Sequence, residues 1–179
     1  HFQTELTPIQ VPVGRVGYSL TGAVMTLRPP GTVVADDLRA DVSFEQFFHQ
    51  QDSMVALVRH ARRMAKMDGA MLIEGGTGTG KSLLAQACHR ISAVAKGPLV
   101  VLDCTTLGDQ QLERELFGSS DGIQDATIDD ERPGVLERAA GGTLLLDQIC
   151  EMSPLLQRRL LQFIESGFFR RVGGHRELF

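Results

Sequence analysis

The stretch GGTGTGKS, Gly75 to Ser82, carries the residues whose types and spacing are most suited to chemistry. It fits the pattern G-x-x-x-x-G-K-[ST], in which Gly75 and Gly80 enclose four residues before Lys81 and Ser82. Glycines let backbone N–H groups turn inward around phosphates, the lysine supplies a positive charge for the outer phosphates, and the hydroxyl binds Mg²⁺. The candidate ligands are Gly75, Gly76, Thr77, Gly78, Thr79, Gly80, Lys81 and Ser82. The stretch therefore predicts a site for a nucleoside triphosphate.

A second stretch, GGTLLLDQI from Gly141 to Ile149, is an apolar run that ends in Asp147 and Gln148. An acidic residue at the end of a buried strand near such a loop is placed to bind Mg²⁺, directly or through water. Ser82 and Asp147 are therefore the expected metal ligands. Gln148 stands where a general base should polarise the attacking water. Because an amide orients water but cannot accept its proton at neutral pH, we expect slow hydrolysis.

The segments around these residues predict the elements that position them. Apolar runs predict strands at AMLIE (70–74), PLVVLDC (98–104) and GGTLLLDQI (141–149). Helical spacing predicts helices from Asp52 or Ser53 to 65, over 82–95, over 108–118, and over 153–167, the last with a Ser-Pro start and a glycine stop. Strands that are continuously apolar and alternate with helices favour an α/β fold, with a parallel sheet covered by helices on both faces.

The first 43 residues have a different texture from the rest. Residues 1–28 predict two strands around a turn, a β-hairpin that completes a sheet, and residues 29–43 contain prolines, glycine and acids typical of a linker. We expect residues 44–179 to form the main domain. Because the chain starts with His1 rather than Met, we expect it to be a piece of a longer protein.

Composition excludes several classes of function. The chain has 179 residues, 42% of them hydrophobic, and a formal net charge of -4. This balance suits a soluble domain and gives no electrostatic reason for this piece itself to grip nucleic acid. It contains no apolar run of about 18 residues that could span a membrane. Its three cysteines, Cys88, Cys104 and Cys150, are far apart, so we expect free buried thiols of a cytoplasmic protein.

Four motifs in one order resemble a known family. GGTGTGKS, ELFG (115–118), GGTLLLDQI and SPLLQRRLLQFIESGFFRRVGG (153–174) resemble the AAA+ ATPase domain of bacterial enhancer-binding transcriptional regulators, which act with sigma-54 RNA polymerase. The resemblance covers about residues 44–174, and residues 1–28 resemble the last strands of a PAS sensory domain. It implies ATP and Mg²⁺ as cofactors and assembly with itself as a ring or dimer. It also implies RNA polymerase as a partner, and DNA contact through a helix-turn-helix domain absent from this chain.

Three departures from the family pattern bear on activity. Family members that remodel sigma-54 polymerase carry a Gly-Ala-Phe-Thr-Gly-Ala loop, where this chain has GIQDAT, Gly122 to Thr127. The acid that often follows the loop lysine in the family is replaced by Ser82. An Asn–Glu pair of the family is matched by Asp103 and Gln148, an exchange in which an amide can still donate to a carboxylate. The PAS-like end and the altered loop resemble the TyrR-like subgroup, whose namesake works with the housekeeping polymerase.

The departures leave alternatives open. In the first, Asp103 serves as the base for slow turnover. In the second, Asp103 and Gln148 are neutral changes that arose after hydrolysis had lost its importance. In the third, Gln148 is an engineered replacement of Glu that traps bound ATP. We favour a nucleotide-binding regulatory module with weak or no hydrolysis over an active ATPase that remodels sigma-54 polymerase, because the latter needs the aromatic loop and the catalytic Glu.

Overall fold

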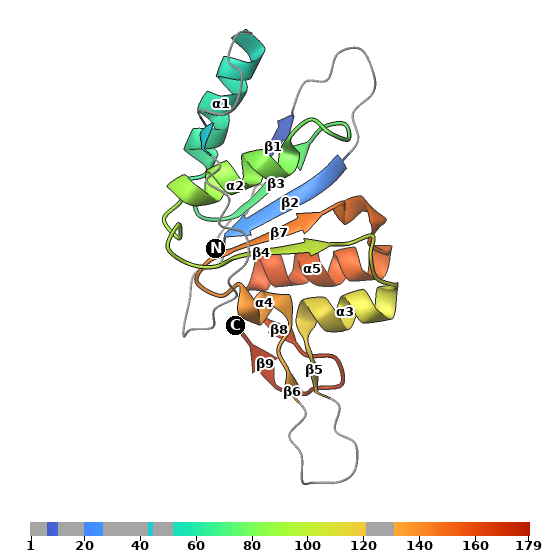
Figure 1. Ribbon diagram of the computed structural model, residues 1–179. Coiled ribbons are helices and arrows are strands. Elements are labelled where there is room, and N and C mark those ends of the chain that lie inside the picture. The colour runs from blue at the N-terminus through green and yellow to red at the C-terminus, as the bar shows by residue number, and fades with distance from the viewer. Residues whose placement is uncertain (1–6, 11–19, 27–42, 45–51, 121–130) are drawn as a thin grey trace.

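The computed structural model describes residues 7–10, 20–26, 43–44, 52–120 and 131–179 (Figure 1). GIQDAT and nearly all of the expected linker lie outside these residues. The strands are β1 (Thr7–Gln10), β2 (Leu20–Thr26), β3 (Ala70–Glu74), β4 (Leu99–Asp103), β5 (Ser119–Ser120), β6 (Glu131–Arg132), β7 (Thr143–Asp147), β8 (Phe169–Arg170) and β9 (Glu177–Leu178). The helices are α1 (Asp52–Met64), α2 (Lys81–Ile91), α3 (Asp109–Phe117), α4 (Val135–Arg138), the 3₁₀ turn η2 (Ile149–Glu151) and α5 (Pro154–Ser166).

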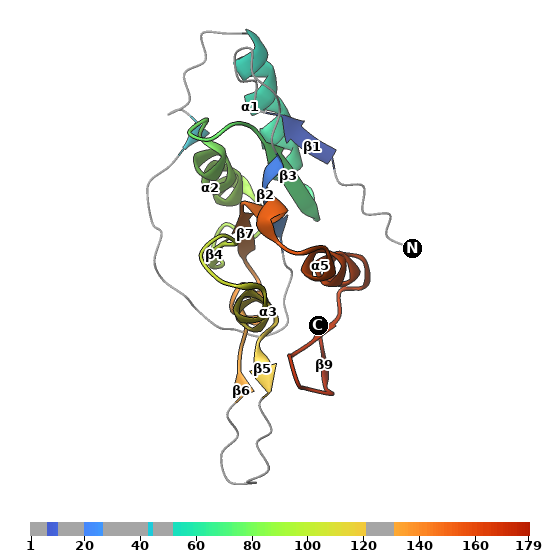
Figure 2. The same cartoon turned by 90° about the vertical axis from the view of Figure 1, so that its right-hand side faces the viewer.

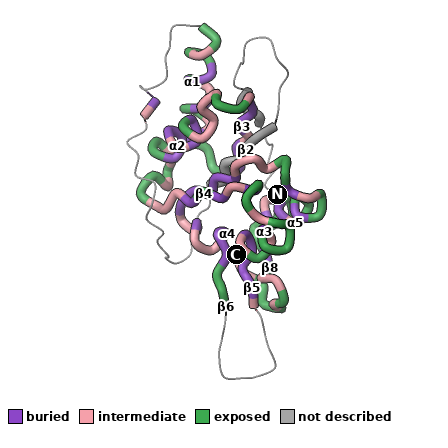
Figure 3. The backbone as a smooth tube through the Cα atoms, turned by 45° about the vertical axis from the view of Figure 1, so that its right-hand side comes forward, coloured by how far each residue is buried: buried purple, intermediate pink, exposed green. Residues whose placement is uncertain are grey.

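Five strands form the central sheet, in the order β1-β3-β2-β7-β4. β4 and β7 run parallel, as do β1 and β3, whereas β2 runs antiparallel to both of its neighbours. The α/β architecture is therefore confirmed, with parallel pairs joined through one antiparallel strand. Leu144 and Leu146 pack with α3, α4 and α5, while Leu145 packs with α1 and α2. Helices thus cover both faces of the sheet, and the buried residues lie where they meet it (Figures 2 and 3).

The predicted hairpin of residues 1–28 is wrong in its pairing. Strands do occur at β1 and β2, but the two do not pair with each other: each pairs with β3, and β2 also pairs with β7. The physical reason is that a lone two-stranded hairpin is marginal in water, whereas β3 and β7 offer rows of backbone N–H and C=O groups that β2 satisfies. The origin of these strands in a PAS-like sheet stays a prediction.

The starts of β4 and β7 are fixed by a close approach of two backbones. Thr143 N–H donates to Pro98 O at 2.8 Å, and Gly142 N–H donates to Ala139 O at 2.9 Å. A Cβ atom on Gly142 would lie 2.0 Å from Pro98 O, and one on Gly97 would lie 2.0 Å from Gly141 O. Only glycine fits at these two positions, so the chain can bring β4 alongside β7 with Asp103 opposite Asp147.

Replacing Gly142 by Ala is expected to lower the free energy of unfolding by about 1–3 kcal/mol, because backbone atoms must shift to accept the methyl group. Gly108→Ala is the matched control, since a Cβ atom there meets nothing within 4 Å and its φ is -70°. Its cost should stay below about 1 kcal/mol, the loss of a glycine N-cap. Denaturant unfolding measures both, and equal losses in the two variants would contradict the close approach.

A buried histidine joins α2 to β7. His89 is 8% exposed, and its Nδ1 lies 2.8 Å from Thr143 Oγ1. Burial lowers the pKa of His89 from its ordinary value of 6.5, because the charged imidazolium loses its hydration. The unfolded chain therefore binds this proton more readily than the folded chain does. The stabilisation is present above about pH 6.5 and is lost as the pH falls through the lowered pKa of His89.

We therefore expect the free energy of unfolding to decline as the pH falls below about 6.5, and His89→Gln to remove part of that decline. Glutamine keeps a partner for the Thr143 hydroxyl but does not titrate. Denaturant midpoints measured across pH 5 to 7 decide the point, with a Gln substitution at the exposed His175 as the control. A decline that persists unchanged in His89→Gln would contradict the assignment.

Candidate functional site

The glycine-rich loop connects β3 to α2 at the carboxyl end of the sheet. Gly78 and Gly80 adopt positive φ angles of 77° and 89°, which glycine reaches without steric cost. Thr79 Oγ1 donates to Gly76 O at 2.8 Å and closes the turn. The loop therefore has the curled backbone that the sequence pattern predicts, and the N-terminus of α2 follows directly.

Two sources of positive charge meet at the start of α2. Lys81 is the first residue of the helix, and its Nζ donates to Gly75 O at 3.1 Å and to Gly76 O at 2.7 Å, which holds the ammonium over the loop. Gly80, the N-cap, provides no side-chain hydrogen bond to the first turn. The N–H groups of that turn therefore add the positive end of the helix dipole to the charge of Lys81. This arrangement suits a phosphate group.

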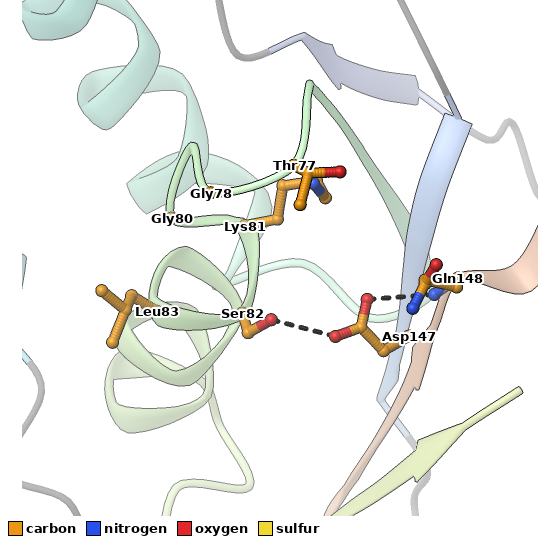
Figure 4. Close-up of a pocket in the computed structure, with 8 residues that line it drawn as sticks. All are labelled: Thr77, Gly78, Gly80, Lys81, Ser82, Leu83, Asp147 and Gln148. Atoms are coloured by element: carbon orange, nitrogen blue, oxygen red, sulfur yellow. Dashed lines mark hydrogen bonds between the residues drawn. The ribbon is translucent and has the colours of Figure 1, made fainter. Parts of the chain in front are cut away.

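Ser82 and Asp147 are 65 residues apart in the chain and meet in the structure. Ser82 Oγ donates to Asp147 Oδ2 at 3.1 Å, across from α2 to the end of β7 (Figure 4). A hydroxyl and a carboxylate are oxygen ligands of the kind that Mg²⁺ takes. The two side chains therefore fit the predicted metal site, and their role as ligands stays a prediction.

These residues border one cavity of about 350 Å³. Its wall is formed by Thr77, Gly78, Gly80, Lys81, Ser82, Leu83, Asp147 and Gln148, as Figure 4 shows. Leu83 is half exposed at the edge of the cavity. The sequence did not predict it, because a leucine after the motif has no feature that indicates a cavity residue. Gly75, Gly76, Thr79 and Asp103, all expected at the site, do not line the cavity, although the first three build the loop behind it.

Gln148 has an unusual backbone. With φ 54° and ψ 46°, it is the single non-glycine residue with positive φ among those that the structure describes. Its N–H donates to Asp147 Oδ1 at 3.0 Å, so both oxygens of that carboxylate accept hydrogen bonds. A left-handed conformation costs a non-glycine residue about 1–3 kcal/mol and is common where a site needs it. The bend turns the chain from β7 into η2 with Gln148 at the cavity.

Asp103 lies beside this site but is engaged elsewhere. It is opposite Asp147 in the ladder of β4 and β7. Its Oδ1 accepts hydrogen bonds from Thr105 N–H at 2.9 Å and from Thr105 Oγ1 at 2.7 Å. The two bonds from Thr105 hold the pKa of the Asp103 carboxyl below its ordinary value, because they favour the charged form. Among the described residues, the Gln148 amide makes no hydrogen bond to this carboxylate, so the exchanged pair that the sequence permits is not formed.

Two of the three cysteines flank the same strand ends. Cys104 N–H donates to Asp147 O at 3.1 Å, and its thiol is buried. Burial, with smaller contributions from the charges of Asp103 and Asp147, raises the pKa of Cys104 to about 12. Cys150 is exposed, so the expectation of buried thiols is wrong for this residue, because η2 places it on the surface. All three cysteines are free, as expected.

None of the helices in the described part of the chain is long and apolar enough to cross a membrane. Comparisons with known protein families, with individual proteins and with solved structures all agree with a nucleotide-binding fold of this kind. The family model described as the sigma-54 interaction domain matches residues 47–178.

Individual relatives are regulatory proteins. The chain is 37% identical over 182 aligned positions to the HTH-type transcriptional regulatory protein TyrR of Salmonella typhimurium, covering 99% of this chain and 34% of that protein. It is 39% identical over 145 positions to the Nif-specific regulatory protein of Azotobacter vinelandii, covering 78% of this chain and 28% of that protein. The chain thus spans about a third of the length of the curated relatives that it matches.

A solved structure with the same fold is NtrX from Brucella abortus in complex with ATP. It has a TM-score of 0.60 and 29% sequence identity, and the match covers 74% of this chain and 29% of the NtrX chain. A second NtrX structure, in complex with ADP, has the same TM-score at 27% identity. These solved relatives thus hold adenine nucleotides.

Proposed function

Since the chain belongs to the family of sigma-54 interaction domains of bacterial transcriptional regulators, we propose that it is the ATP-binding AAA+ module of a TyrR-like regulator, with weak or no hydrolysis. The observation that carries the proposal is the cavity in which Lys81, Ser82 and Asp147 converge, with Gln148 also in its wall. The likeness to NtrX in complex with ATP supports the choice of nucleotide.

Each side chain has a distinct task in this proposal. Lys81 and the first turn of α2 bind the phosphates by charge and by N–H donation. Ser82 and Asp147 hold Mg²⁺, which when bound neutralises the charge of the outer phosphates. The present hydrogen bond between Ser82 Oγ and Asp147 Oδ2 keeps the two oxygens close enough to share one ion.

Weak hydrolysis follows from the groups around the attacking water. Gln148 orients a water molecule but does not take its proton at neutral pH. The Asp103 carboxylate is held by Thr105 instead of facing the cavity. Nucleotide would therefore stay bound long enough to set the state of the regulator rather than being turned over rapidly.

The wider setting extends beyond this chain. We place the protein in the cytoplasm, assembled as a ring or dimer, with RNA polymerase as a partner and DNA bound through a helix-turn-helix domain outside this chain. The names of the relatives, among them an HTH-type regulator, support this setting. A PAS-like origin for residues 1–28, a linker at 29–43 and an AAA+ core over 44–179 complete the proposed organisation.

A second candidate is an active ATPase that remodels sigma-54 RNA polymerase. The description of the matching family favours it. Against it stand Gln148 and the GIQDAT sequence, which departs from the aromatic loop of remodelling family members.

The test is calorimetric titration of the complete protein with ATP, with and without Mg²⁺, followed by steady-state turnover. We expect saturable ATP binding that Mg²⁺ strengthens, and turnover close to the background rate. Absence of ATP binding would overturn the nucleotide-binding function. Turnover of about 1 s⁻¹ or faster, within the ordinary range of enzymes, would favour the remodelling ATPase.

A further inference from the structure

Asp103 is near the nucleotide cavity and on the correct side of the sheet. Paired residues of neighbouring parallel strands point their side chains to the same face. Leu145, two residues before Asp147, packs in the core that β7 shares with α1 and α2, so Asp147 and its partner Asp103 share the face that carries the glycine-rich loop. A rotation of the Asp103 side chain, without movement of β4, could therefore turn the carboxylate toward the cavity.

In the structure, Thr105 holds this carboxylate by two hydrogen bonds. Its hydroxyl and its N–H both donate to Oδ1 of Asp103, at 2.7 and 2.9 Å. Hydrogen bonds to a carboxylate are stronger than those between neutral groups. Because both donors come from one residue just after the strand, they hold the carboxylate over its own turn, and Asp103 does not line the cavity.

We propose that Thr105 is a positioning residue that holds the Asp103 carboxylate outside the nucleotide cavity and so withholds a base that Gln148 cannot replace. This inference rests on the proposed function, since it concerns the same nucleotide site. The step that Thr105 slows is the hydrolysis of ATP. In it, a water molecule gives a proton to a carboxylate oxygen of Asp103, and the oxygen of that water forms a bond to the γ-phosphorus of ATP. The bond from that phosphorus to the bridging oxygen breaks, which leaves ADP and phosphate. Thr105 thus sets how fast bound nucleotide is lost.

The test compares Thr105→Ala and Thr105→Ser in the complete protein. Alanine removes the hydroxyl bond to Asp103 and keeps the N–H bond, whereas serine keeps both. The matched control is Thr106→Ala, because the Thr106 hydroxyl donates at 3.0 Å to the backbone oxygen of Asp103 and not to its carboxylate. Two quantities are read: the pKa of Asp103, from NMR titration of its carboxyl carbon without nucleotide, and ATP turnover.

Thr105→Ala is expected to raise the pKa of Asp103 toward its ordinary value and to raise turnover by about three- to tenfold, less than the full value of a hydrogen bond to a charged group because water screens this exposed pair. Thr105→Ser and Thr106→Ala should keep native values of both. Adding Asp103→Asn to Thr105→Ala should return turnover to the native level, because the freed side chain then accepts no proton.

Two results would overturn the proposal: turnover in Thr105→Ala within about twofold of native, or a rise that survives Asp103→Asn. Failure of the proposed function is seen separately, in calorimetry of the native protein with ATP. If ATP does not bind, the titration of Asp103 still decides whether Thr105 holds its carboxylate, since that measurement uses no nucleotide.

Discussion

Replacing Gln148 by Glu is expected to raise ATP turnover in the complete protein by about 10²–10⁴-fold, the usual contribution of a positioned general base. The backbone already presents the side chain at the cavity, and glutamate meets the same steric restriction at φ 54° as the glutamine it replaces, because the two side chains have the same shape. Glutamate differs from Gln148 mainly in accepting a proton from water. Single-turnover and steady-state assays with ATP and Mg²⁺ measure the gain.

The double variant Gln148→Glu with Asp103→Asn is the companion experiment, because it restores the pair that the family resemblance implies. We expect its turnover to equal or exceed that of Gln148→Glu. Brisk native turnover that Asp103→Asn alone abolishes would contradict this view and make Asp103 the working base. A Gln148→Glu variant that binds ATP normally and stays inactive would show that more than the base is missing.

Replacing Lys81 by Ala is expected to weaken ATP binding by about 10²-fold. The ammonium supplies charge-assisted hydrogen bonds to the phosphates, each contributing about 1.5–3 kcal/mol, and about 1.4 kcal/mol corresponds to a factor of ten in affinity. Its present acceptors, Gly75 O and Gly76 O, lose a donor at the same time, which loosens the loop. Calorimetric titration with ATP measures the change in dissociation constant.

Lys96→Ala is the matched control, since Lys96 is an exposed lysine outside the cavity wall. Its affinity for ATP should match the native value, which separates a local effect at Lys81 from a change in net charge. Binding by Lys81→Ala within about threefold of native would show that the phosphates lie elsewhere.

Much of the fold could be predicted from local sequence. The apolar runs of β3, β4 and β7 lie where the sequence places them, because strands covered on both faces exclude polar residues. α5 begins at Pro154 and ends at Ser166, and the C-cap that follows is Gly167, whose φ of 76° explains the glycine stop. α2 is shorter than predicted and ends at Ile91, because the Ser92 hydroxyl and N–H both turn back to His89 O.

What the sequence left out depends on contacts between distant segments. β2 lies between β3 and β7 in the sheet. The alternation of apolar and polar residues within 20–26 does not show which strands it will pair with. The left-handed backbone of Gln148 arises from the bend between β7 and η2. The sequence does not predict it, because the position is not occupied by glycine. Thr105 follows Asp103 at the spacing of an Asx turn, a pattern that could have been noticed but is too common to indicate a function.

Because Cys104 is buried beside Asp147, the rate at which its thiol is alkylated reports how often this part of the structure opens. A thiol with a pKa of about 12 is almost wholly protonated at neutral pH, so an alkylating reagent finds no nucleophile there while β4 and β7 stay joined. Cys150, exposed three residues after Asp147, is accessible to the same reagent from the start. The delay between the modification of Cys150 and that of Cys104 therefore measures how long these strand ends take to separate, and a ligand that binds across them should lengthen it.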